Sequence, residues 1–252
     1  MKRISLIALF AVFNIYAHEF VIKPNQTDAV AGQKIPFSVQ VTHRFMISEE
    51  IEDSASVDIA LFEKGKKGSE SRLFVNESFL TLDGTVTPVQ KGAAIITGHR
   101  RSVAWSKTTQ GWQVGNRKTL KGVLESNLYE KFAKALIIVD NDDTGFDAVV
   151  GDRLEIVPMA SPTKCKVGDK LSFKVLFGGE PLKTEVKAVY DGFSRENDSY
   201  TFSGESDTNG VAAIPITSKG VWMVRAENTV PPDDKDMYGK HNLRAVYIFE
   251  IR

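Results

Sequence analysis

The chain has 252 residues, and its 32 Lys and Arg residues balance 32 Asp and Glu residues, so the formal net charge at pH 7 is zero. No cluster of Lys or Arg residues is present in the sequence, which argues against a nucleic-acid partner. The single cysteine, Cys165, excludes an intramolecular disulfide. The length allows one large domain or two smaller domains.

The first seventeen residues have the pattern of a secretory signal peptide. Lys2 and Arg3 form a basic start, residues 4–15 are almost entirely apolar, and Ala17 places a small residue at a cleavage position. The apolar run is too short to cross a hydrocarbon core of about 30 Å. We therefore expect residues 1–17 to be removed and the protein to be periplasmic. Because no second long apolar run follows, the mature chain is not expected to be embedded in a membrane.

Cleavage after Ala17 makes His18 the first residue of the mature chain. An N-terminal histidine carries an imidazole and a free α-amine, and both groups can bind one metal ion in a chelate ring. The alternative is that His18 only marks the point where the processing enzyme cuts.

Short β-strands are predicted through most of the first half of the mature chain, where β-branched and aromatic residues alternate between Gly, Pro and Asn clusters. The predicted strands are residues 19–23, 34–42, 57–63, 72–75, 92–97 and 102–107. One segment differs, because Leu120, Leu124, Leu128, Phe132 and Leu136 recur every four residues. This spacing predicts a single amphipathic helix of about four turns.

The rest of the chain is predicted to form seven more strands, separated by glycine-rich and polar turns. They are residues 153–158, 170–177, 185–190, 199–203, 211–216, 221–226 and 243–251. Seven short strands at this spacing are typical of an immunoglobulin-like sandwich. The predicted fold class is therefore mainly β, with two β-sandwich domains and one amphipathic helix between them. We expect an N-terminal β domain over residues 18–150, with the helix near its end, and a C-terminal immunoglobulin-like domain over residues 151–252.

Four histidines are the main candidates for chemistry: His18, His43, His99 and His241. His18 begins one predicted strand and His43 follows another, so the two can meet at one edge of a sandwich. Together they resemble a histidine brace, in which an N-terminal amine, its own imidazole and a second imidazole bind copper. The same donors suit Ni²⁺ and Co²⁺. His99, in a predicted turn, is a third candidate metal ligand, whereas the polar segment around His241 is interpreted as a solvated loop.

Acidic residues follow His43 closely, at Glu49, Glu50, Glu52 and Asp53. They could supply a carboxylate ligand to a metal ion, or they could form an exposed acidic loop. The sequence lacks the nucleophile elbow of hydrolases, the His-Glu-x-x-His helix of metalloproteases and a phosphate-binding glycine loop. No enzymatic activity is therefore predicted.

The mature start, Ala17-His18-Glu19-Phe20-Val21-Ile22-Lys23-Pro24, resembles the Ala-His-x-Phe/Trp…Pro opening of a bacterial periplasmic family of largely unknown function, the DUF4198 type. Val41-Thr42-His43-Arg44-Phe45 is similar to that family's Gly-His-x-Phe strand end, with Thr42 in place of the usual Gly. Further similar segments are residues 130–132, 151–158, 168–171, 176–182, 207–211 and 220–226.

Members of this family are described as periplasmic components of cobalt or nickel uptake systems. The resemblance therefore implies two β domains and a role in transition-metal handling. It favours a periplasmic protein that binds Ni²⁺ or Co²⁺, or else Cu²⁺, through His18 and His43 and assists uptake by a membrane transporter. Two alternatives are a binding or adhesion module of tandem β-sandwiches without a metal, and copper-dependent oxidation at the histidine brace.

Overall fold

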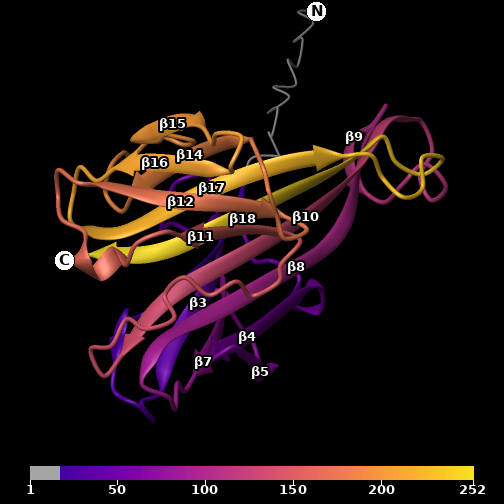
Figure 1. Ribbon diagram of the computed structural model, residues 1–252. Helices are drawn as coiled ribbons and strands as arrows, with labels where there is room; N and C mark the ends of the chain where they lie inside the picture. The colour runs from indigo at the N-terminus through magenta and orange to yellow at the C-terminus, as the bar shows by residue number, and fades with distance from the viewer. Residues whose placement is uncertain (1–17) are drawn as a thin grey trace, which may run out of the picture.

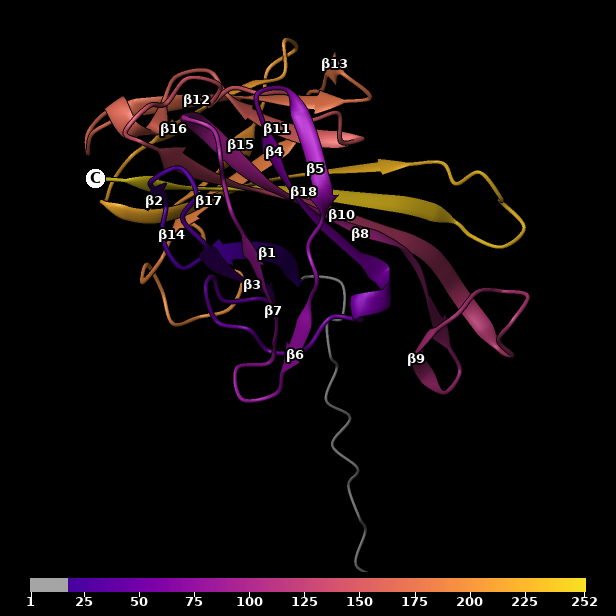
Figure 2. The ribbon, with the colours of Figure 1, turned by 90° about the horizontal axis from the view of Figure 1, so that it is seen from below.

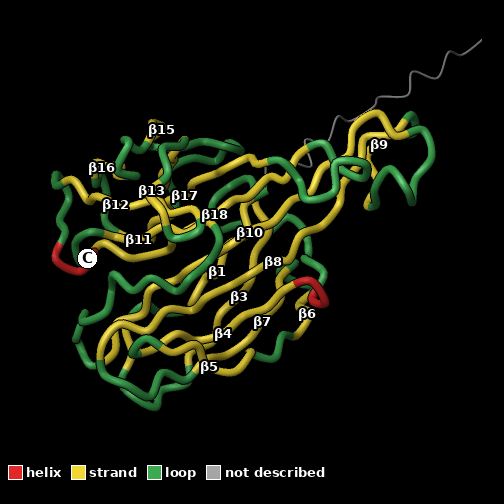
Figure 3. The backbone as a smooth tube through the Cα atoms, turned by 45° about the vertical axis from the view of Figure 1, so that its right-hand side comes forward, coloured by secondary structure: helices red, strands yellow, loops and turns green. Residues whose placement is uncertain are grey.

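The computed structural model describes residues 18–252, and the predicted signal peptide at residues 1–17 lies outside the described residues. Strands form most of the described chain, whose helical segments are two short 3₁₀ turns, η1 Ser54–Ser56 and η2 Pro162–Lys164 (Figures 1 and 3). Within residues 18–252, no helix is long and apolar enough to cross a membrane. The mainly-β class predicted from the sequence is confirmed.

The strands of the first half are β1 Glu19–Pro24, β2 Asp28–Ala29, β3 Ile35–Thr42, β4 Val57–Glu63, β5 Lys66–Glu70, β6 Phe74–Asn76, β7 Thr81–Val86, β8 Gly92–Thr108, β9 Gly111–Val114 and β10 Val123–Val139. The strands of the second half are β11 Leu154–Pro158, β12 Lys170–Phe177, β13 Glu180–Pro181, β14 Glu185–Tyr190, β15 Phe202–Glu205, β16 Val211–Pro215, β17 Gly220–Val230 and β18 Lys240–Ile251. Each of the seven strands predicted after residue 151 overlaps an observed strand. In the first half, the strands β2, β5, β7 and β9 were not predicted, and two predicted strands are the single long strand β8.

Two smaller sheets cover two hydrophobic cores. The sheet of order β1-β3-β7-β6 contributes to one core, here called the N-terminal core, and the sheet of β11, β12, β13 and β16 contributes to the other, the C-terminal core. Each core also contains residues from the other half of the chain, such as Ile248 in the N-terminal core and Phe62 in the C-terminal core. Antiparallel strands divided between facing sheets are the arrangement of a β-sandwich, the architecture that immunoglobulin-like domains share.

The two cores share one central sheet of ten strands, because β10 and β18 pair in parallel from Asn127↔Lys240 to Ala135↔Ile248. The two smaller sheets lie on opposite faces of this central sheet (Figure 2). Alternate residues of β10 therefore enter different cores, with Ala133 in the N-terminal core and Phe132 in the C-terminal core. The main-chain hydrogen bonds between β10 and β18 join the two parts of the chain into one sheet. The domain boundary predicted at residue 151 stays a prediction.

The predicted helix is wrong, since its residues form most of strand β10. A four-residue repeat lies near the helical period, but it is also a multiple of the two-residue period of a strand. Phe132 and Leu136 accordingly lie on one face of β10 and pack in the C-terminal core, as the strand period requires. Leu124 is 65% exposed, near the end of β10 that extends beyond the smaller sheets. Residues 133–139 are nearly all apolar, which favours a strand buried on both faces.

Candidate metal centre

The pairing of β1 with β3 brings His18 and His43 together. The two strands are antiparallel, with Glu19 opposite Thr42, so the residue before β1 and the residue after β3 share one edge of the sheet. The centroids of the two imidazole rings are 3.7 Å apart, and the ring planes are inclined by 48°. Both side chains are 13% exposed, which leaves them within reach of an ion from solvent. The structure thus brings together the pair that the strand pattern favours.

The loop after His43 turns back sharply and returns Glu49 to the same place. Its turn contains a bridge between Arg44 and Ile47, and Met46 has a left-handed backbone with φ of 69°. The Glu49 backbone N–H then donates to the carbonyl of Val41 at 2.9 Å, which places Glu49 beside the end of β3. The acidic segment is therefore not only an exposed loop, because its residue Glu49 is held beside His43 at the end of β3.

The Glu49 carboxylate is held by two groups of the same residue. Its Oε1 accepts the backbone N–H of His43 at 3.1 Å, and its Oε2 lies 2.8 Å from the His43 ring Nδ1. Partial burial acts to raise the pKa of Glu49, but these hydrogen bonds and the nearby imidazoles outweigh burial and lower it. Glu49 is therefore a fixed, ionised carboxylate that faces both imidazoles.

These three side chains have the composition and spacing of a small metal site. One ligand atom each from His18, His43 and Glu49 lies within 4.8 Å of the other two. The His18 Nε2 lies 3.7 Å from Glu49 Oε2, and the His18 Nδ1 lies 3.7 Å from an oxygen of Glu50. An ion about 2.1 Å from each donor separates tetrahedral ligands by about 3.4 Å, so small side-chain movements suffice for binding. The donor set fits a transition-metal ion.

The second half of the chain holds the backbone of both histidines. Arg244 of β18 donates from Nη1 to the carbonyl of His18 at 3.3 Å, and the Asp198 backbone N–H donates to the carbonyl of His43 at 2.9 Å. Glu19, which is 2% exposed, forms ion pairs with Arg225 at 3.3 Å and with Arg244 at 3.2 Å. These supporting residues could not be identified from the sequence, because a buried Glu–Arg network between distant strands leaves no local pattern.

His99, the third candidate metal ligand, does not join the His18–His43–Glu49 cluster. In β8, His99 stacks on Phe132 of the C-terminal core, with ring centroids 4.9 Å apart, while the neighbouring Arg100 lines a cavity beside His18. Adjacent residues of a strand point to opposite faces, so the central sheet separates His99 from His18.

His241 is not in a solvated loop, because it lies near the start of β18 and is 5% exposed. Glu130 of β10 joins it to His99, since one carboxylate oxygen lies 3.0 Å from the His241 Nε2 and the other 2.7 Å from the His99 Nε2. Arg153 completes the group, with Nη1 3.3 Å from the His241 Nδ1 and 3.8 Å from Glu130. This cluster fastens the two halves of the chain at the β10–β18 junction.

A Glu130→Gln variant is expected to lose stability in a pH-dependent way. Burial acts to raise the pKa of Glu130, but hydrogen bonds from His241 and His99 outweigh it and lower the pKa from 4.5 to about 2. A depressed pKa stabilises the folded state above the unfolded pKa and ceases to do so as the pH falls through the folded pKa. Urea unfolding should show wild type more stable by about 1–2 kcal/mol above pH 4.5, a gap that closes towards pH 2. A difference in unfolding free energy that stays the same between pH 4.5 and pH 2 would show that the ionised Glu130 does not stabilise the fold.

The structure is therefore that of a mainly-β protein with two cores on a shared central sheet and a His–His–Glu cluster at one edge of a smaller sheet. The chain belongs to the family described as "Domain of unknown function (DUF4198)", whose model matches residues 15–230. This match confirms the family that the sequence motifs resemble. A comparison with curated proteins gives no match.

The comparison with solved structures finds distant matches. The D0–D1 domain of Intimin is 14% identical with a TM-score of 0.23, covering 90% of this chain and 96% of that one. The tandem Ig repeats of Dlar are 13% identical with a TM-score of 0.23, covering 92% and 100%. A DUF4785 family protein from Legionella pneumophila is 12% identical with a TM-score of 0.28, and the match covers 88% of this chain but 45% of that protein. At these TM-scores the backbones differ widely, so the fold assignment rests on the strand pairing itself.

Proposed function

We propose that this protein is a periplasmic, non-enzymatic metal-binding protein that captures Ni²⁺ or Co²⁺ and assists uptake by a membrane transporter. The observation that carries the proposal is the convergence of His18, His43 and Glu49, whose ligand atoms lie within 4.8 Å of one another. Imidazole nitrogens and a carboxylate oxygen are suitable donors for Ni²⁺, Co²⁺ and Cu²⁺. Cleavage after Ala17 would add the α-amine of His18 as a further donor.

The surroundings of the cluster support capture and release of an ion. Both imidazoles are 13% exposed and Glu49 is 32% exposed, so an ion can enter without unfolding of the loop. The ion pairs of Glu19 and the backbone contacts from Arg244 and Asp198 fix the strand ends that carry the histidines. A fixed donor set raises affinity because less side-chain ordering accompanies binding.

Titration calorimetry of the mature chain, beginning at His18, tests the proposal. We expect one Ni²⁺ or Co²⁺ ion to bind per chain, and His18→Ala or His43→Ala to weaken binding by on the order of 100-fold, because each removes a direct ligand. His99→Ala is the matched control, since His99 lies on the opposite face of the central sheet and its removal should leave the affinity unchanged. Equal affinity in wild type, His18→Ala and His43→Ala would instead favour a binding or adhesion module without a metal.

A further inference from the structure

A cavity of about 220 Å³ adjoins the His18–His43–Glu49 cluster, and His18 forms part of its wall. Its floor is the central sheet, where Arg100 and Trp105 of β8 lie beside Tyr129 and Lys131 of β10. The register between β8 and β10 shifts after Tyr129, which pairs with Val103, so that Lys131 pairs with Arg100. This bulge in β8 lets residues 100 and 103, which are an odd number of positions apart, line the same cavity.

The floor of this cavity carries two cations side by side. Arg100 is 3% exposed, its Nε lacks a hydrogen-bond partner among the described residues, and the nearest carboxylate, that of Glu52, is 3.8 Å away. Lys131 is the direct cross-strand neighbour of Arg100. Burial and then repulsion from Arg100 lower the pKa of Lys131 to about 7, although the carboxylates of Glu52 and Glu19 oppose this effect. A negatively charged ligand oxygen would supply the hydrogen bond that the Arg100 Nε lacks and would offset the repulsion between the two cations.

The other walls restrict the kind of anion that fits. Trp105 and Trp112 give the cavity an aromatic side, and the carboxylates of Glu50, Glu52 and Asp53 also line it. The cavity is smaller than the roughly 300–1,000 Å³ of pockets for drug-sized molecules. A small molecule with a carboxylate at one end and a neutral or basic group at the other therefore matches the walls better than an inorganic polyanion.

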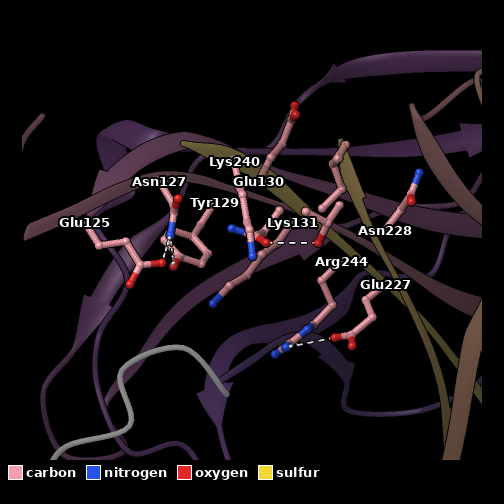
Figure 4. A pocket seen from close by; sticks show the side chains of 12 residues that line it. Glu125, Asn127, Tyr129, Glu130, Lys131, Glu227, Asn228, Lys240 and Arg244 are labelled. Atoms are coloured by element: carbon pink, nitrogen blue, oxygen red, sulfur yellow. Dashed lines mark hydrogen bonds and ion pairs between the residues drawn. The ribbon is translucent and has the colours of Figure 1, made fainter. Parts of the chain in front are cut away.

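Lys131 can also be reached from a second side. Lys131 and Tyr129 line a neighbouring cavity of about 330 Å³, which Arg244 and Lys240 also line (Figure 4). The side chain of Lys131 thus lines two cavities on the same face of the sheet, and a ligand from solvent can reach it through either cavity.

Taking the proposed metal function as given, we propose that this cavity binds a small carboxylate-bearing chelator of the metal ion. One carboxylate contacts Arg100 and Lys131, while other donors of the same molecule complete the coordination of the ion at His18, His43 and Glu49. The protein then captures a metal chelate in preference to a hydrated ion. The chelator can be an amino acid or an organic acid, because both carry a carboxylate and both have further donor atoms for the coordination positions that the protein leaves open.

Calorimetry with preformed one-to-one nickel complexes of L-histidine, histamine and citrate tests this proposal. L-histidine and histamine chelate nickel with the same imidazole and amine, but histamine lacks the carboxylate. We expect wild type to bind the L-histidine complex at least about ten-fold more tightly than the histamine complex, the effect of one desolvated charge-assisted contact. The citrate complex identifies the source: preference for citrate over L-histidine assigns an organic acid, and the reverse assigns an amino acid.

Lys131→Gln should abolish the preference for the carboxylate-bearing complex and leave the affinity for hydrated Ni²⁺ unchanged. Lys240→Gln is the matched control, because Lys240 lines the neighbouring cavity but not the cavity beside His18, and this variant should preserve the preference. Equal binding of the L-histidine, citrate and histamine complexes by wild type, or a preference that persists in Lys131→Gln, would overturn the inference. Failure of hydrated Ni²⁺ to bind would instead overturn the proposed function, and titration of ion-free protein with L-histidine and citrate would then decide whether the cavity binds carboxylates.

Discussion

A protein with one glycine added in front of His18 is expected to bind Ni²⁺ on the order of 100-fold or more weakly than the protein that begins at His18. The added residue converts the α-amine into an amide, which is a poor metal ligand, and removes the chelate ring. Loss of outer-shell support alone costs 10–100-fold in metal affinity, so loss of a direct donor should cost at least as much. Titration calorimetry of the two proteins, prepared with defined N-termini, measures the difference.

The control for this comparison is the thermal stability of the two proteins. Glu19, one residue further on, is held by Arg225 and Arg244, so an extension at His18 should leave the thermal unfolding midpoint unchanged. Mass spectrometry of the exported protein should also show His18 as the first residue. Equal affinities for the extended and mature proteins would show that the amine is not a ligand, and would reduce the site to the side chains of His18, His43 and Glu49.

The pairing of the two histidines could be predicted from the sequence because it depends on local patterns. His18 directly precedes one strand and His43 directly follows another, and both strands are marked by β-branched and aromatic residues. Glu49 could be named as a candidate from its charge. Its position could not be predicted, because that depends on the left-handed turn at Met46 and on the bridge between Arg44 and Ile47.

Other features depend on contacts that no local pattern encodes. The parallel pairing of β10 with β18 joins residues more than a hundred positions apart, and it is this pairing that buries His241 beside Glu130. The four-residue repeat of β10 fits both a helix and a strand, so only the cores on both faces decide between them. Long-range burial therefore accounts for both errors, the helix and the solvated His241.

The ion pair between Lys134 and Glu155 is expected to have the largest effect on stability of any pair in the described chain. Lys134 lies in β10 and Glu155 in β11, their side chains are 3% and 2% exposed, and Nζ lies 2.8 Å from Oε1. Removing one partner of a buried pair leaves an uncompensated charge and costs about 3–5 kcal/mol. We expect Lys134→Met to lower the free energy of unfolding by this amount, as measured by urea denaturation.

The double variant Lys134→Met, Glu155→Leu separates the charge from the packing. It leaves neither charge of the pair, so it should be more stable than Lys134→Met. The backbone N–H groups of Val150 and Gly151 donate to Glu155 at 2.7 and 3.1 Å, and they lose this acceptor in the double variant. Glu155→Gln keeps an acceptor for these groups and therefore separates the loss of charge from the loss of these hydrogen bonds.

The matched control is Lys164→Met. The ion pair of Lys164 with Asp143 at 2.9 Å has a lysine side chain that is 76% exposed, and it should contribute less than about 1 kcal/mol to the free energy of unfolding. Similar losses in Lys134→Met and Lys164→Met would contradict the expectation. Because Lys134 and Glu155 pack in the C-terminal core, on the opposite face of the central sheet from His18, none of these variants should change the affinity for Ni²⁺.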